Sequence, residues 1–327
     1  MTSTTHFPGT ASAPFVSFLG APHLDDATAP SARFAFIGAP FGVPYGMRQV
    51  HYGASDAPRA VRVKSVRFAA FHAHYDFDLG GSLDRHGPLV LVDCGDVLAD
   101  PRDLAGSAER VSQTVSAQLD AGRMPIVVGG DDSTSALALR GFANAVPFEI
   151  LQIDAHIDFR DDVNGIRDGY SSPMRRASEM PWVQRIVHVG ARGVGSARPA
   201  DVVDTLAAGN RIVTARQARR GGAEAVLRHF TPGGRYYIVF DCDGMDPAVM
   251  PGTSAPMPGG LEYDLMLDIV HGLVEQGTVV GINFAEHYPA LDFNGITSLA
   301  IVRTIVNLMG AMLSKSVAAG GSHHPKP

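Results

Sequence analysis

Residues 148–158 decide the fold and read FEILQIDAHID. The first six residues are largely apolar, which is typical of a parallel strand that is covered on both faces. Polar side chains follow without a break. Because alternate side chains of an extended segment point the same way, we expect Asp154, His156 and Asp158 to share one face at the end of this strand.

Outward from this stretch, short apolar runs alternate with longer amphipathic ones. This alternation predicts an α/β protein with three layers, α/β/α, around a central, mostly parallel sheet. The predicted strands are Arg33–Ile37, Leu89–Asp93, Pro125–Val128, Phe148–Ile153, Arg185–Val189, Tyr236–Phe240 and Thr278–Phe284. The predicted helices are Asp103–Ala121, Ser133–Ala143, Ala200–Ala208, Gly222–His229, Glu262–Gln276 and Ile296–Leu313.

The chain divides into one domain and two tails. Residues 1–30 are rich in Ser, Thr, Ala and Pro and are predicted to form an N-terminal arm. Residues 31–315 form a single domain, and residues 316–327, which include His323 and His324, form a flexible tail. The last predicted helix is apolar almost all round, so it is buried either in the core or at a subunit interface.

The composition excludes several classes of protein. The formal net charge is −6 and no block of Lys and Arg occurs, which argues against nucleic-acid binding. The two cysteines, Cys94 and Cys242, lie in apolar runs, so we expect free thiols and a cytoplasmic location. We expect no membrane span, because no run of about 18 apolar residues stands out, and no secretory signal.

Two other predicted strands also end in acidic residues. Residues 129–133 read GGDDS, and residues 241–247 read DCDGMDP. In this architecture, sites form beyond the carboxyl ends of strands. Converging carboxylates and an imidazole are costly to bury unless a cation neutralises them, and this ligand set suits Mn²⁺ or Ni²⁺. A pair of such ions roughly 3.5–4 Å apart would activate water.

Each of these residues, taken alone, could have a purely structural role. A single Asp-x-Asp is usually a turn or a helix cap, whereas two such motifs after two apolar strands are far more specific. Cys242 lies between two acidic residues, but its side chain should face the opposite side of the strand and join the core. His188, inside an apolar strand, is expected to be a satisfied core histidine.

Further motifs extend the pattern over nearly the whole chain. Residues 42–45 read GVPY, 53–62 read GASDAPRAVR, 251–253 read PGT, 258–260 read PGG, and 281–289 read GINFAEHYP. With the three strand-end motifs, the chain resembles the ureohydrolases, namely arginases, agmatinases and their guanidino-acid relatives. The resemblance implies an arginase-like fold that uses two divalent ions to hydrolyse a guanidinium carbon–nitrogen bond, giving an amine and urea.

The resemblance also implies roles for individual residues. Asp154 and Asp241 would bridge the two ions, Asp158 would bind one ion, and His156 and Asp243 would bind the other. Glu286 would grip the substrate, which makes physical sense because a planar cation with several N–H donors favours a carboxylate.

Two functional histidines of the family pattern are replaced. Asp132 stands where the family usually reads histidine in GGDHS; its carboxylate can still reach an ion, but it adds negative charge. Tyr170 stands where a histidine serves as a proton shuttle, and a phenol with an ordinary pKa of about 10 is a poor shuttle near neutral pH. Smaller departures make the pocket less polar: Asn283 for Asp, Ala255 for Thr and Met257 for Glu.

These departures favour one functional hypothesis over another. The chain resembles the less catalytic subunit of a metformin-hydrolase-like heteromer, with a degraded metal site that supports an active paralogue in a trimer or hexamer. The complex would convert a substituted guanidine or biguanide to an amine and urea or a guanylurea-type product. The alternative is a self-sufficient dinuclear agmatinase or guanidino-acid hydrolase with altered specificity, and a metal-free binding module is a minor third. The predicted catalytic residues are Glu286 and Tyr170, and the predicted metal ligands are Asp132, Asp154, His156, Asp158, Asp241 and Asp243.

Overall fold

The computed structural model describes residues 16–24, 32–43, 45, 52–87, 89–100 and 102–320. Residues 1–15 and 25–30 of the predicted arm, and the His323–His324 pair of the predicted tail, lie outside the described residues. Within the described part of the arm, Phe18 is fully buried and stacks on Phe36 with ring centroids 4.5 Å apart. The last helix continues to Gly320, inside the stretch predicted as a tail.

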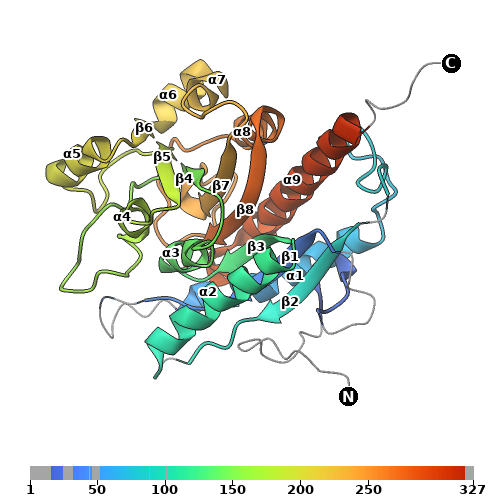
Figure 1. The fold of residues 1–327 in the computed structure, drawn as a ribbon, viewed down its shortest axis with the longest axis horizontal. Helices are drawn as coiled ribbons and strands as arrows, with labels where there is room; N and C mark the ends of the chain where they lie inside the picture. Colours follow the sequence, from blue (N-terminus) through green and yellow to red (C-terminus); the bar gives the residue numbers. More distant parts are fainter. Residues whose placement is uncertain are drawn as a thin grey trace.

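The sheet has eight strands in the order β2-β1-β3-β8-β7-β4-β5-β6, and every pairing is parallel (Figure 1). The strands are β1 Phe34–Ala39, β2 Leu91–Asp96, β3 Met124–Gly129, β4 Phe148–Ile153, β5 Val183–Val189, β6 Arg211–Val213, β7 Arg235–Asp241 and β8 Thr278–Ala285. The helices are α1 Ala57–Ala69, α2 Leu104–Asp120, α3 Ser133–Arg140, α4 Pro173–Ser178, α5 Pro199–Ala207, α6 Ala215–Gly221, α7 Glu224–Leu227, α8 Tyr263–Gln276 and α9 Ile296–Gly320.

All seven predicted strands and all six predicted helices are present, and four elements were missed. Strand β6 has only three residues, too few to show a periodic pattern. Helices α4 and α6 are also short. Helix α1 was missed for another reason: the buried face of this helix carries Arg62, whose Nε lies 2.8 Å from Asp93 Oδ2. A charged side chain on the inner face hides the helical period.

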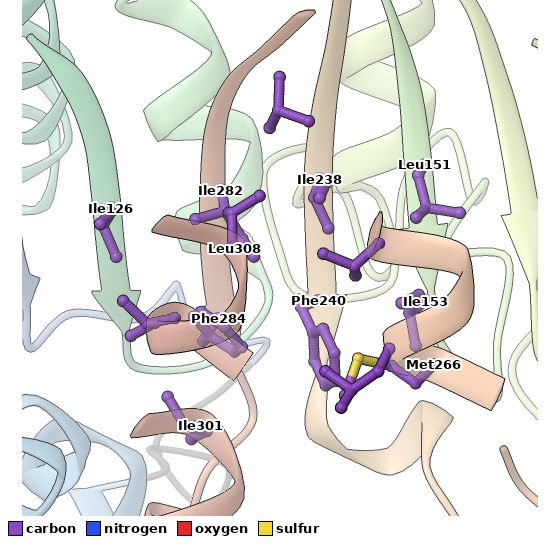
Figure 2. Packing of buried hydrophobic residues seen from close by; sticks show 14 of the residues in the cluster. Ile126, Leu151, Ile153, Ile238, Phe240, Met266, Ile282, Phe284, Ile301 and Leu308 are labelled. Atoms are coloured by element: carbon purple, nitrogen blue, oxygen red, sulfur yellow. The ribbon is translucent and has the colours of Figure 1, made fainter. Parts of the chain in front are cut away.

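Alternate side chains of the strands build two separate cores, as the pleat of a sheet requires. On one face, Ile126, Ile238 and Phe284 pack with α8 and α9, shown in Figure 2. On the other face, Val127 and Val239 pack with α2, α3 and α4. The three-layer α/β/α architecture is therefore confirmed.

Helix α9 belongs to the first of these cores. Ile301, Ile305 and Leu308 are fully buried, and the helix packs against α1 and α8. The sequence left open whether this helix is buried in the core or at a subunit interface. The face of α9 that carries these three residues is buried in the core. The segment Phe293–Ser316 is long and apolar enough to cross a membrane, and 72% of its 18-residue window is buried inside the protein. This corrects the expectation that no such segment exists. A mostly buried core helix would meet the same criteria of length and hydropathy.

Candidate metal centre

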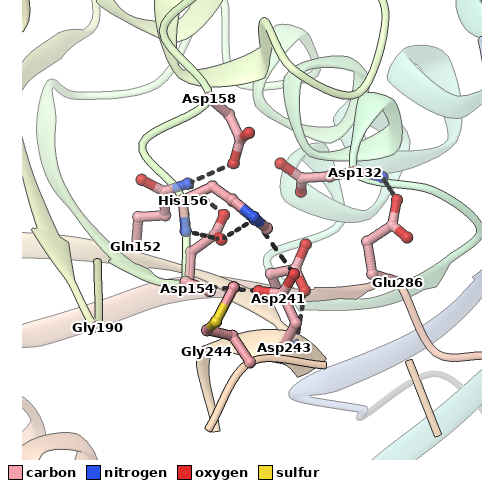
Figure 3. A network of polar contacts seen from close by, with 12 residues as sticks. Asp132, Gln152, Asp154, His156, Asp158, Gly190, Asp241, Asp243, Gly244 and Glu286 are labelled. Carbon is pink, nitrogen blue, oxygen red and sulfur yellow. Dashed lines mark hydrogen bonds and ion pairs between the residues drawn. The ribbon is translucent and has the colours of Figure 1, made fainter. Parts of the chain in front are cut away.

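The predicted metal residues lie at the carboxyl ends of four neighbouring central strands. The sheet places β3, β8, β7 and β4 side by side, so the ends of strands that are far apart in sequence meet at one edge. Residues from all four converge there (Figure 3). They are Asp132 after β3, Glu286 after β8, Asp241 and Asp243 at the end of β7, and Asp154, His156 and Asp158 after β4.

Two sets of side chains have their candidate ligand atoms within 4.8 Å of one another. The imidazole set consists of Asp154, His156 and Asp243, and the carboxylate set consists of Asp132, Asp154 and Asp241. All five residues are buried except His156, whose side chain is 22% exposed. Asp154 belongs to both sets, so its carboxylate lies where two cations could share it.

The imidazole set is oriented by bonds within the strand-end loops. His156 Nδ1 lies 3.3 Å from Asp154 Oδ1 and 3.2 Å from Asp243 Oδ2. Asp154 Oδ1 accepts the His156 backbone N–H at 2.6 Å, and Asp243 Oδ1 accepts the Ala155 N–H at 3.0 Å. The second oxygen of each carboxylate is also engaged, Asp243 Oδ2 by His156 and Asp154 Oδ2 by the Gln152 amide.

Close approach of the neighbouring loops fixes Asp154 in place. A Cβ at Gly244 would lie 2.5 Å from the backbone nitrogen of Asp154, and one at Gly190 would lie 2.6 Å from its carbonyl oxygen. Gly190 also has φ 112°, in a region that L side chains rarely adopt. The loops after β5 and β7 can therefore press against Asp154 only because both positions lack a side chain.

Asp158 is adjacent to the two sets but belongs to neither. The Gln152 amide donates from Nε2 to Asp154 Oδ2 at 2.6 Å and to Asp158 Oδ2 at 3.1 Å. The Gln152 Oε1 in turn is hydrogen-bonded to Nδ1 of the buried His188. Sequence reasoning missed Gln152, although its position two residues before Asp154 on the same face of β4 was a usable signal.

His188 is a buried core histidine, but it is only half satisfied. Its Nε2 has no hydrogen-bond partner among the described residues. Burial lowers the pKa of His188 to about 3, so the ring is neutral and Nδ1 carries the hydrogen that reaches Gln152. Cys242 is fully buried in the core on the α8–α9 face, as predicted, and neither Cys94 nor Cys242 forms a disulfide within the described residues.

Asp132 is oriented by two groups. Its backbone N–H donates to Glu286 Oε1 at 3.0 Å, and its Oδ1 accepts a hydrogen bond from the Ser135 hydroxyl. Its Oδ2 is buried and has no hydrogen-bond partner in the described structure. A buried carboxylate oxygen without a partner is costly, and a cation held by the carboxylate set would relieve that cost.

Two of these residues have a strained backbone. Glu286 has φ 57° and Asp158 has φ 41°, and non-glycine residues in this region cost about 1–3 kcal/mol each. The Glu286 N–H donates to the Gly130 carbonyl at 2.9 Å, which ties β8 to the end of β3. Glu286 Oε2 accepts the Ser254 hydroxyl at 3.2 Å. The strain is retained at the point where the acidic side chains converge.

The pKa values of the site residues reflect the crowding of acidic groups in the metal-free protein. Burial, followed by repulsion from Asp154, raises the pKa of Asp132 well above its ordinary value. Burial and Asp131 raise the pKa of Glu286 to about 8. Burial would lower the pKa of His156, but Asp154 and Asp243 together raise it to about 11. Carboxylates that resist ionisation at neutral pH are expected where divalent cations normally compensate the charge.

A cavity of about 230 Å³ opens above the two sets. Tyr170 lines it, with its ring centroid 4.6 Å from that of Tyr45, and burial and Tyr45 raise the Tyr170 pKa above its ordinary value of 10. Ala255 also lines the cavity, whereas Met257 does not and lies against Gly193. The complete lining is Asp132, His156, Asp158, Tyr170, Ser171, Ser196, Asp241, Asp243, Ser254, Ala255 and Glu286.

Comparisons with known proteins agree with this arrangement. The model of the arginase family matches residues 32–310. A formimidoylglutamase from Halalkalibacterium halodurans is 29% identical over 297 residues, which are 87% of this chain and 88% of that protein. A guanidinopropionase from Pseudomonas aeruginosa is 31% identical over 288 residues, or 85% and 86% of the two chains. The solved structure of proclavaminate amidino hydrolase from Streptomyces clavuligerus superposes with a TM-score of 0.78 at 27% identity, covering 92% of this chain and 98% of that one.

Proposed function

The chain belongs to the arginase family, and from that premise we propose that it holds two divalent ions and hydrolyses a carbon–nitrogen bond of a small guanidino compound. One observation carries the proposal: Asp154 is common to two sets of candidate ligands. A shared carboxylate between two sets is what a dinuclear centre requires. Similarity to proteins named formimidoylglutamase and guanidinopropionase supports the reaction class without choosing the substrate.

The residues present fit a pair of Mn²⁺ or Ni²⁺ ions. Carboxylate and imidazole donors suit such borderline cations, and the unpartnered Asp132 Oδ2 offers a ligand atom in the carboxylate set. In this proposal Asp154 and Asp241 would be ligands of both ions, His156 and Asp243 would hold one of them, and Asp132 and Asp158 would hold the other. When bound, the ions supply the Lewis acidity that makes water nucleophilic at neutral pH.

Glu286 is proposed to bind and orient the guanidinium group. Its carboxylate lines the cavity and is fixed through Oε1 by the Asp132 N–H and through Oε2 by the Ser254 hydroxyl. Acceptor oxygens fixed in this way offer a planar cation a directed partner. Ala255 and Tyr170 leave the rest of the cavity less polar than the family pattern, which favours a substituted guanidine or biguanide over arginine.

A second candidate is the supporting subunit of a heteromer, and Tyr170 is the observation that favours it. The Tyr170 pKa lies above 10 because of burial and Tyr45, so this phenol holds its proton at neutral pH. A chain without a proton shuttle would turn over slowly by itself. It would then assist an active, metformin-hydrolase-like paralogue in a trimer or hexamer. The two cysteines form no disulfide within the described residues, which suits the cytoplasm.

The test is to purify the chain alone after expression with Mn²⁺ or Ni²⁺ and to measure ions per chain by elemental analysis. About two ions per chain, with urea released from a panel of substituted guanidines, is the result expected of a hydrolase. Two ions without urea release, and with release only after co-expression with a paralogue, would favour the supporting subunit. A chain that holds no metal would refute the proposed centre.

A further inference from the structure

A buried hydrogen-bond relay connects Asp132 to strand β8. Asn283 on β8 is fully buried, and its Nδ2 donates to Ser135 Oγ at 2.8 Å. Ser135, also fully buried, lies in the first turn of α3 and its hydroxyl donates to Asp132 Oδ1. We call Asn283, Ser135 and Asp132 the β8 relay.

The direction of the β8 relay follows from the chemistry of its members. A carboxylate that binds a cation is ionised and only accepts, so in the metal-bound state the hydrogen between Ser135 and Asp132 must come from the hydroxyl. That hydroxyl has one hydrogen, and an amide N–H₂ only donates, so Ser135 Oγ accepts from Asn283 and gives its own hydrogen to Asp132. Donation therefore runs from β8 toward Asp132 Oδ1, and Asp132 Oδ2 has no hydrogen-bond partner among the described residues.

We propose that Asn283 and Ser135 are positioning residues that make Asp132 a working metal ligand, an inference that rests on the proposed metal centre. The relay holds Oδ1 and presents Oδ2 to the cation. Positions 132 and 283, where the resemblance implies histidine and aspartate, carry Asp132 and Asn283 here, and the relay links the two. A carboxylate ligand needs a donor behind it, which asparagine provides through Ser135.

A histidine ligand would require the opposite direction. Its second ring N–H donates, so it needs an acceptor behind it, commonly a carboxylate. With aspartate at position 283, Ser135 would accept from the imidazole and donate to that aspartate. Aspartate at both positions would place two acceptors around one hydroxyl hydrogen and add a buried charge. Histidine with asparagine would place two donors on the Ser135 oxygen and, with the Asn283 amide in its present orientation, leave the hydroxyl hydrogen without an acceptor.

The decisive experiment titrates Mn²⁺ into four metal-free proteins by calorimetry, with ions per chain counted independently. These are the wild-type chain, Asn283→Asp, Asp132→His, and the double variant. Each single substitution is expected to weaken the affinity for one of the two Mn²⁺ ions by about tenfold or more, which is the usual effect of losing the partner that orients a metal ligand. The double variant is expected to recover to within a few-fold of wild type. The effect of Asn283→Asp thus reverses sign with the residue at position 132, which a merely structural role would not produce.

Ser135→Ala gives a second measurement that remains available even if a buried aspartate at 283 prevents folding. It removes the hydroxyl that donates to Asp132 and is expected to weaken the affinity for one Mn²⁺ ion about tenfold. Ser112→Ala is the matched control, because Ser112 is also a buried helical serine, with its hydroxyl donating to the Leu137 carbonyl at 2.9 Å, outside the metal centre. That control should leave Mn²⁺ binding unchanged, with both variants unfolding at similar temperatures when metal-free.

The outcomes separate the relay from the metal centre. If the two substitutions act additively, or if Ser135→Ala binds Mn²⁺ as tightly as Ser112→Ala, the relay is overturned and the metal centre stands. If the double variant binds two ions and the wild-type chain binds only one or none, Asp132 is not a working ligand and the inference fails. If none of the proteins binds Mn²⁺, the proposed function itself is wrong.

Discussion

The two halves of the metal centre are held in place in different ways. In the imidazole set, Asp154 and Asp243 accept backbone N–H groups from residues 155 and 156, in the loop after β4. In the carboxylate set, Asp132 depends on Ser135 of α3, on Asn283 of β8 and on Glu286 just after β8, the last two about 150 residues further along the chain. The imidazole set also contains a cationic group, His156, whereas the carboxylate set contains only acids. Only Asp154 and His156 are oriented by local sequence. Asp243 reaches them through the pairing of β4 with β7, and the carboxylate set likewise depends on the assembled sheet.

The largest effect is expected from Asp154→Asn, because this carboxylate is common to both halves. A neutral amide at this position should abolish binding of both ions, measured as ions per chain by elemental analysis. Asp120→Asn, which changes an exposed carboxylate at the end of α2, is the control and should keep the wild-type count. A variant that still holds one ion would show that the two sets do not share Asp154.

Next in size are the substitutions that separate the halves. Asp132→Ala should remove one ion and leave about one per chain, because the imidazole set keeps all its members. His156→Ala should likewise leave about one ion, held by the carboxylate set. Calorimetric titration with Mn²⁺ checks both. Loss of both ions from either variant would mean that the halves bind metal only as a unit.

Glu286→Gln tests whether this residue belongs to the metal centre or to the substrate site. The amide keeps an acceptor for the Asp132 N–H, so ions per chain should stay at the wild-type value. Binding of guanidinium to the metal-loaded protein should weaken roughly 30-fold, since a partner of a buried charge pair is worth about 2 kcal/mol or more. Calorimetry with guanidinium chloride measures the effect, and unchanged affinity would remove Glu286 from the substrate site.

The smallest effect concerns the metal-free protein and pH. The pKa of Glu286 rises from 4.5 to about 8 on folding, through burial and the nearby Asp131. A raised carboxyl pKa means that folding favours the protonated form. Its contribution is therefore fully present below about pH 4.5 and is lost as the pH rises toward 8. The melting temperature of chelator-treated protein should fall by several degrees over this window.

The matched comparison for this pH effect is Glu286→Gln. Its metal-free melting temperature should fall less steeply over the same range, because one of the buried titrating groups is gone. Wild type and variant with identical slopes would mean that other carboxyl groups account for the pH dependence.

Much of the fold could be predicted from the sequence because parallel strands covered on both faces are nearly continuous apolar runs. Strand β6 and helix α1 were not predicted, for physical reasons. Strand β6 is too short to show a periodic pattern, and the Arg62 that α1 buries against Asp93 interrupts the apolar face of the helix. The candidate ligands could be named because each directly follows a recognisable strand. Gln152 was missed because a lone amide in an apolar strand carries no motif, although it joins Asp154 to Asp158.

The sequence by itself determined the alternation of strands and helices, the acidic motifs at three strand ends, and the family resemblance. These are local properties, since side-chain periodicity and strand-end chemistry act over a few residues. The resemblance already implied that Asp154 is shared, and the tertiary structure places it in both ligand sets. Only the tertiary structure decided that Asp132 is backed by Ser135 and Asn283. Those contacts depend on the strand order β3-β8-β7-β4, which brings residues far apart in the chain within hydrogen-bond distance. Hydrogen bonds are short and directional, so no pattern along the chain can specify them until the sheet has assembled.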